Sequence, residues 1–87
     1  MSKYNLGLII VSHKRSSKHR EEILQSKECA CFCCLKIFIA SDIIKWLDNQ
    51  QTAICPNCGV DSVIGDKSGY PITDIEYLKM MKKYWFE

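Results

Sequence analysis

The sequence predicts an α+β fold in a single domain spanning residues 1–87. Two Cys-x-x-Cys pairs bracket the middle of the chain, and the segments beside them are short and rich in branched apolar residues. The C-terminal segment 74–86 instead repeats apolar residues at helical spacing, and a shorter apolar run precedes the cysteines. These patterns predict a small zinc-ribbon-like α+β domain with an N-terminal strand or packed arm followed by a helix, short strands around the cysteines and a C-terminal amphipathic helix.

The two cysteine pairs have the spacing of a four-thiolate zinc site. Cys31 and Cys34 form the first pair, and Cys55 and Cys58 form the second. Two residues between cysteines let both sulfurs contact one tetrahedral ion, while backbone N–H groups of the turn face the thiolates. Gly59 fits this turn, because the residue after the second thiolate often needs a positive φ. We therefore expect one Zn²⁺ per chain at these four cysteines.

Other interpretations of the cysteines are weaker. A disulfide framework requires an oxidising compartment, yet the apolar run 6–11 is too short for a secretory signal and precedes the basic residues. Iron and a redox-active dithiol remain alternatives on ligand type. Cys33 lies inside the first pair and cannot easily join its tetrahedron, although Cys29 and Cys33 have a spacing that metal sites tolerate. We expect both to be small, partly buried apolar side chains.

Composition indicates a folded protein outside the membrane. The chain has 87 residues, 47% of them hydrophobic, and no apolar run is long enough to cross a bilayer. A chain of this length buries too little surface to be comfortably stable, so zinc would act as a staple. The formal charge of +2 counts thiols as neutral, and four thiolates with one Zn²⁺ bring it to about zero. We expect a soluble, cytoplasmic protein whose net charge does not favour nucleic acid.

Two elements are expected before the cysteines. The segment 4–12 has a continuous core of branched residues, which predicts a buried strand or a packed N-terminal arm. Ser17 is the expected N-cap of a helix that reaches about Lys27. His19 and Ile23 lie one turn apart on that helix, so His19 is either a core histidine, which we favour, or a hydrogen-bond donor to a thiolate.

Short strands and one helix are expected around the second pair. The segment 35–39 should leave the first pair as a strand, and Ser41 or Asp42 should cap a helix over 43–48 that lays Trp46 beside the metal. A turn at 49–51 and strands at 52–54 and 60–64 complete this region. A strand after the second pair, where a treble clef has a long helix, favours a zinc-ribbon-like domain.

The C-terminal region combines a loop with a helix. The segment 65–71 is dense in turn formers. Thr73 and Glu76 have the spacing of a capping box, which opens the last helix. We expect Leu78, Met81 and Trp85 to pack inward and Tyr77 and Tyr84 to lie at the edge. The expected floor for this helix comprises Ile37, Ile39, Trp46, Ile54, Val60, Ile64 and the segment 8–11.

A resemblance covers most of the chain after Ser12. The residues that carry it are His19-Arg20, 29–34, Ile43 with Trp46, 52–59, 61–66, 68–73 and Trp85-Phe86. They resemble a family of small, uncharacterised bacterial proteins of the cytoplasm with zinc-ribbon-like motifs. Ala30 and Cys33 depart from the family's pattern, and a tyrosine at the position of Cys33 supports leaving that residue out of the metal site. The resemblance implies a bacterial or phage-borne cytosolic zinc protein, and it implies no activity.

Two binding functions follow from the surface residues. The favoured one is a regulatory module that binds another protein through its aromatic and loop surfaces, for which the candidate residues are Asp61, Asp66, Tyr70 and Trp85. The alternative is a zinc-ribbon nucleic-acid-binding protein that meets the phosphates of RNA or DNA with basic residues. The candidates for that role are Lys14, Arg15, Lys18 and Arg20.

An enzyme is the weakest interpretation. His13 or His19 with Asp61 or Asp66 near a metal would be the only candidates, and no nucleophile and base stand at a recognisable spacing. Four thiolates also close a zinc ion to water. We expect no enzymatic activity, no small-molecule substrate and no membrane partner.

Overall fold

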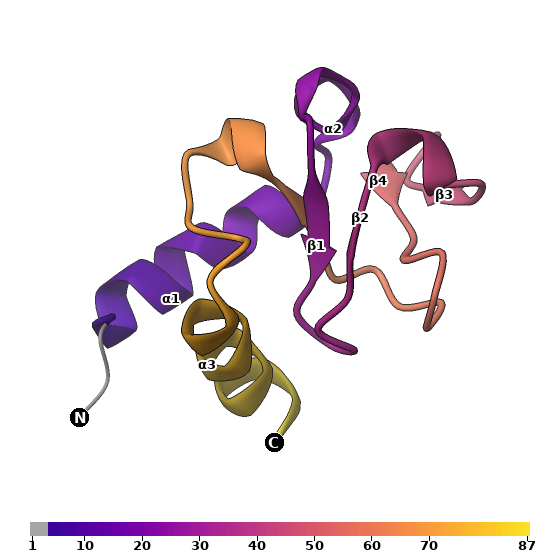
Figure 1. Ribbon diagram of the computed structural model, residues 1–87. Coiled ribbons are helices and arrows are strands. Elements are labelled where there is room, and N and C mark those ends of the chain that lie inside the picture. Colours follow the sequence, from indigo (N-terminus) through magenta and orange to yellow (C-terminus); the bar gives the residue numbers. More distant parts are fainter. Residues whose placement is uncertain (1–3) are drawn as a thin grey trace.

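The computed structural model describes residues 4–87 and confirms the α+β fold. The helices are α1 (Leu6–Ser12), α2 (Arg20–Gln25) and α3 (Ile75–Phe86), and the strands are β1 (Cys29–Cys31), β2 (Ile37–Phe38), β3 (Trp46–Leu47), β4 (Thr52–Ala53) and β5 (Val63–Gly65). Short 3₁₀ turns lie at His13–Ser16, Ala40–Asp42 and Asp66–Ser68. Helices α1 and α3 lie on one side of the strands (Figure 1). Within residues 4–87 no helix is long and apolar enough to span a bilayer.

The strands form two small antiparallel sheets. In the larger sheet β1 lies between β2 and β5, while β3 and β4 form a separate hairpin. Ala30 on β1 is paired with Ile37 on one neighbour and with Ile64 on the other. Every residue of β1 and β5 is buried, so β1 is the centre of the fold.

The larger sheet separates two apolar clusters, because successive residues of a strand point to opposite faces. The helical cluster packs around α1 and α3 and comprises Ile9, Ala30, Phe32, Ile64, Ile72, Tyr77, Leu78 and Met81. The cysteine cluster lies on the other face and comprises Ile23, Cys29, Cys31, Ile43, Ala53, Cys55 and Val63. Strand β1 thus contributes Ala30 to one cluster and its two cysteines to the other.

The N-terminal segment packs against α3, as expected for an arm. It forms the helix α1, so the predicted strand is wrong. The Asn5 side chain caps α1 by accepting a hydrogen bond of 2.8 Å from the backbone N–H of Leu8. A continuous apolar run fits either a buried strand or a helix, and here the cap selects the helix. Only one face is covered, since Ile9 is fully buried while Ile10 and Val11 are exposed.

Helix α2 is shorter than expected, and Ser17 is not its N-cap. Ser17 has extended backbone angles, Lys18 follows with a φ of 48°, and His19 occupies the N-cap position. The helix ends after Gln25, where the Ser26 backbone turns to extended geometry. A left-handed residue before the helix gave no signal in the sequence, because lysine rarely adopts that conformation.

The expected helix over 43–48 is also wrong. A 3₁₀ turn at Ala40–Asp42 leads into β3, which carries Trp46 as a partly buried side chain against the cysteine cluster. Ile43 is buried and Ile44 is 80% exposed, a two-residue alternation typical of extended chain. The expected turn before β4 is present, with positive φ from Asp48 to Gln50. The strands predicted at 35–39, 52–54 and 60–64 are present as the shorter β2, β4 and β5.

Helix α3 exists as predicted, although its cap lies one residue later. Asp74 rather than Thr73 is the N-cap, and its carboxylate accepts a hydrogen bond of 2.9 Å from the backbone N–H of Glu76. Leu78 and Met81 are fully buried, as expected. Tyr77 was expected at the edge, but it is fully buried, because its hydroxyl donates a hydrogen bond of 2.8 Å to Ser12 on α1 and so needs no water.

The floor beneath α3 differs from the expected one. Ile64 contacts the helical cluster as predicted, and α1 contributes Ile9. Ile37 and Ile39 are exposed instead, and Trp46 packs against the cysteine cluster on the other face of the sheet. The sequence prediction assumed a single core, whereas strand alternation divides the apolar residues between two.

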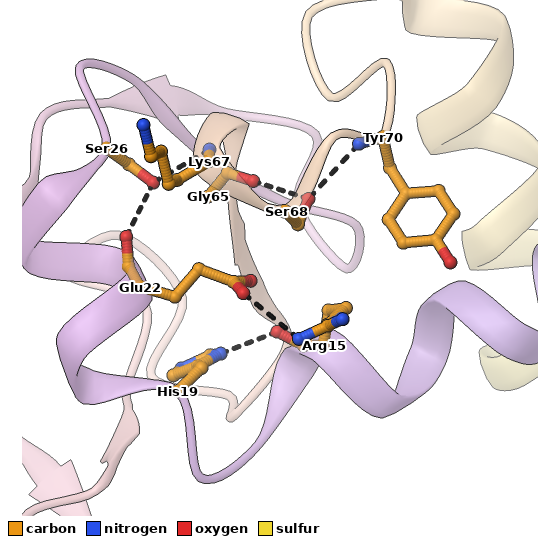
Figure 2. Close-up of polar contacts among 8 residues, drawn as sticks. All are labelled: Arg15, His19, Glu22, Ser26, Gly65, Lys67, Ser68 and Tyr70. Atoms are coloured by element: carbon orange, nitrogen blue, oxygen red, sulfur yellow. Dashed lines mark hydrogen bonds and ion pairs between the residues drawn. The ribbon is translucent and has the colours of Figure 1, made fainter.

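Gly65 at the end of β5 provides a test of the packing between β5 and α2. A Cβ atom at this position would clash with the Ser26 hydroxyl and lie 3.2 Å from Ile23 Cδ1. That hydroxyl is fixed, because it donates to the Glu22 carbonyl and accepts from the Lys67 N–H (Figure 2). We expect Gly65→Ala to lower the free energy of unfolding by roughly 1–3 kcal/mol in denaturant titrations. Gly7→Ala on the exposed face of α1 is the control and should cost less, because its Cβ would lie 3.3 Å from the exposed Asn5 Oδ1 rather than clash with a fixed hydroxyl. Equal unfolding midpoints for both variants would contradict the clash at Gly65.

Candidate metal centre

Four cysteine sulfurs meet at one point of the fold. The Sγ atoms of Cys31, Cys34, Cys55 and Cys58 all lie within 4.8 Å of one another. Cys31 and Cys58 are 3.6 Å apart, and Cys34 and Cys55 are 3.7 Å apart. All four are free thiols. Sulfurs bound at 2.3 Å to one tetrahedral ion would be separated by about 3.8 Å, so this donor set fits a tetrahedral metal ion.

The two cysteine pairs form the same local structure, which we call knuckles. In the first, the backbone N–H groups of Cys33 and Cys34 face Cys31 Sγ at 3.3 and 3.5 Å. In the second, the N–H groups of Asn57 and Cys58 face Cys55 Sγ at 3.3 and 3.4 Å. These N–H groups stabilise the negative charge of a thiolate, so each knuckle favours an ionised sulfur at its first cysteine.

The residue after each knuckle has a left-handed conformation. Gly59 has a φ of 79° and Leu35 has a φ of 65°, and each donates its N–H to the first cysteine's carbonyl, Cys55 and Cys31 respectively. Glycine was expected at such a position, whereas leucine is strained there by about 1–2 kcal/mol. Leu35 also packs against the helical cluster, which offsets that strain and joins the knuckle to the core.

Ser62 is a further residue of the centre that the sequence did not reveal. Its hydroxyl lies 2.9 Å from Cys31 Sγ, and the residue is almost completely buried. A serine hydroxyl so placed donates to a thiolate and orients it without contacting the ion. The only signal in the sequence was its position just before β5, beside the second knuckle.

Without a metal ion, burial and hydrogen bonding shift the pKa values of the thiols in different directions. Burial raises the pKa of Cys31 to about 11, against the opposing hydrogen bond with Ser62. Burial also opposes ionisation of Cys34, but hydrogen bonds with Asn57 and the Lys36 backbone outweigh it and lower the pKa to about 7. These hydrogen bonds therefore favour the thiolate form of Cys34.

The two remaining cysteines, Cys29 and Cys33, lie outside the group of four sulfurs, in agreement with the sequence prediction. Cys29 is fully buried on β1, and burial together with Asp66 raises its pKa to about 12, so it stays a thiol. Cys33 is half-buried, and only its backbone N–H faces a ligand sulfur. Among residues 4–87, four cysteines alone form a group with metal-binding geometry.

His19 is a core histidine and does not contact the thiols. Its Nε2 accepts a hydrogen bond of 3.1 Å from the Ala53 N–H, so Nδ1 carries the proton and donates to the Arg15 carbonyl at 2.6 Å (Figure 2). Burial lowers the pKa of His19, although the Arg15 carbonyl and Glu22 oppose the shift. The neutral ring therefore ties α2 to β4.

The basic residues of the nucleic-acid hypothesis border one open depression of about 600 Å³. These are Lys14, Arg15, Lys18 and Arg20. Lys67 joins them from the 3₁₀ turn after β5, while Glu21 and Glu22 add two carboxylates. The lining is therefore positive overall, and Lys67 was missed because it lies far away in the sequence.

Two of these cations are engaged within the protein. Arg15 forms an ion pair of 3.2 Å with Glu22 (Figure 2). Arg20 donates a hydrogen bond of 3.0 Å to the Gln50 carbonyl and lies 4.6 Å above the Trp46 ring. The arginines thus stabilise the fold, and the lysine side chains supply the remaining positive charge.

The four candidate residues for a partner surface lie in different places. Asp61 and Trp85 border the same small cavity of about 180 Å³. Asp66 instead has a structural role, because its carboxylate accepts the backbone N–H groups of Lys27 and Glu28 at 3.2 and 3.0 Å. Tyr70 is half-buried against the helical cluster.

Comparison with protein-family models, curated proteins and solved structures found no match to this chain. The resemblance to small bacterial proteins of the cytoplasm therefore stays a prediction. What the chain can do follows from its own geometry: four thiolates saturate a tetrahedral ion and leave no position open for water or substrate.

Substitution of the ligands tests the centre. Serine at Cys31, Cys34, Cys55 or Cys58 should abolish metal binding and leave the chain unfolded, because metal affinity is folding free energy in a domain of this kind. Cys33→Ser is the matched control and should retain both metal and fold. Elemental analysis and circular dichroism measure the two properties. Full metal content in any of the four ligand variants, or metal loss in Cys33→Ser, would contradict the assignment.

Proposed function

We propose that this protein is a small zinc-stapled domain that acts as a protein-interaction module in a bacterial cytoplasm. Zinc is the favoured ion because it prefers tetrahedral thiolate sites and undergoes no redox chemistry. Six free cysteines support a reducing compartment. The observation that carries the interaction role is an exposed apolar surface on the second knuckle.

This surface, which we call the Pro56 shelf, comprises Ile37, Phe38, Ile44, Ile54 and Pro56. Pro56 and Asn57 border two adjoining depressions, of about 340 and 260 Å³. Ile44 is 80% exposed and Ile37 is 44% exposed. Single exposed apolar residues are ordinary, but a group of them around one turn indicates a binding surface.

The shelf is supported by a rigid element. Its centre lies within the second knuckle, whose backbone is held by hydrogen bonds to Cys55 Sγ and would be held further by a metal ion at the four cysteines. A surface that is already ordered loses little conformational entropy when a partner binds, so more of the contact energy appears as affinity. A metal ion that orders the second knuckle would therefore increase the affinity of the shelf for its partner.

The charges at the shelf suggest the chemistry of its partner. Lys36 and Lys45 border the two depressions, against the single carboxylate of Asp42. A partner segment with two large apolar side chains and flanking acidic residues matches this combination of apolar floor and positive rim. We take such a segment of another protein as the occupant.

Site-specific photo-crosslinking in the cells that produce the protein tests this role. A photoreactive residue at position 44 should give a discrete adduct with one partner, whereas the same residue at Leu24, which is 56% exposed on α2, should not. Ile37→Lys should weaken the adduct from position 44 by roughly tenfold or more, the loss expected for a buried apolar anchor. A folded, metal-loaded protein that gives no adduct from position 44 would refute the shelf as an interface.

Nucleic-acid binding is the second candidate, favoured by the depression that Lys14, Lys18 and Lys67 share. If phosphates enter it, the logarithm of the affinity for RNA or DNA should fall with the logarithm of salt by roughly one unit per phosphate contacted. Lys14→Gln with Lys18→Gln should reduce that slope, and Lys79→Gln on the exposed face of α3 is the control. Absence of binding in a filter assay at low salt, or a slope unchanged in the double variant, would refute this candidate.

A further inference from the structure

We propose that the cavity between α3 and the turn after α1 is a binding site for the guanidinium group of an arginine in a partner segment. Its lining residues are His13, Ser16, Ser17, Phe32, Asp61, Trp85 and Phe86. None of them belongs to the Pro56 shelf, so this site stands independently of the proposed function.

Aromatic rings form most of the cavity wall. His13 stacks on Trp85 with ring centroids 3.8 Å apart, and Phe32 lies 5.7 Å from Phe86. Phe86 is 45% exposed, so part of its ring remains available to a guest. A guanidinium is flat and weakly hydrated, and it stacks on such rings more readily than an ammonium does.

The polar groups of the cavity specify a cationic guest. Asp61 supplies the one carboxylate of the lining, and no lysine or arginine borders the cavity in the described part of the chain. Burial lowers the pKa of His13, against the opposing effect of Asp61, so the imidazole favours its neutral form and does not repel a cation. A carboxylate accepts two parallel N–H bonds from a guanidinium, a geometry that an ammonium cannot reproduce.

The volume agrees with a single side chain. At about 180 Å³ the cavity offers the space of roughly six water molecules, too little for a folded element. Phosphate and carboxylate guests would face Asp61 without a compensating cation. A purely apolar guest would not use the carboxylate of Asp61.

Nuclear magnetic resonance of the zinc-loaded protein tests the site. We would titrate N-acetyl-arginine amide and follow the two indole N–H signals, since Trp46 lies against the cysteine cluster and is an internal reference. The Trp85 signal should shift saturably at millimolar concentrations while the Trp46 signal stays in place. N-acetyl-norleucine amide and N-acetyl-glutamate amide should have no such effect.

Matched variants distinguish specific recognition of arginine by Asp61 from a general effect of negative charge. Asp61→Asn should weaken arginine binding by about tenfold or more, the loss expected for a charge-assisted hydrogen bond. Glu21→Gln removes the same charge from exposed α2 and should bind as the wild type does. The backbone resonances of each variant report whether it is folded. A missing Trp85 shift, an equal response to norleucine, or wild-type binding by Asp61→Asn would each overturn the proposal.

Discussion

The rest of the structure depends on the meeting of four thiolates at the end of β1. Cys31 is the last residue of that strand, and its sulfur lies 3.6 Å from the sulfur of Cys58 in the second knuckle. The segment 35–54 separates the two knuckles in the sequence. A tetrahedral ion there would fix the distance between the two knuckles, which a hydrogen bond between Cys34 and Asn57 also joins. Structural zinc sites contribute apparent free energies of about 10–16 kcal/mol, comparable to the whole net stability of about 5–15 kcal/mol for a typical domain.

The division of the interior into two clusters indicates what a metal ion at the four cysteines would contribute. The helical cluster is a conventional packing of α1 and α3 on one face of the sheet, with Tyr77 and Ser12 bonded at its edge. The cysteine cluster on the other face is small and includes only a few large apolar side chains, such as Ile23, Ile43 and Val63. Burial of each such side chain contributes roughly 1.5–3 kcal/mol, so without the ion this half of the protein has little to hold it.

Features that depend on local chemistry were predictable from the sequence, and features that depend on distant contacts were not. The knuckles were predicted because cysteine spacing and Gly59 determine them within a few residues, and α3 because its apolar period is regular. The apolar run 6–11 fits a strand or a helix equally well, and Asn5 decides between them through one hydrogen bond. Leu35 adopts a left-handed conformation in which its N–H closes the first knuckle and its side chain packs against the helical cluster, a contact distant in the sequence. The cavity that joins Asp61 to Trp85 likewise follows from tertiary packing alone.

Controlled removal of the metal from the purified protein tests the central claim most directly. We predict one zinc ion per chain by elemental analysis, and a loss of the folded circular dichroism spectrum as a chelator withdraws that ion. Returning one equivalent of zinc should restore the spectrum, since the ion supplies the free energy that joins the two knuckles. A protein that is folded without metal, or that keeps its spectrum and thermal midpoint after complete chelation, would contradict this account.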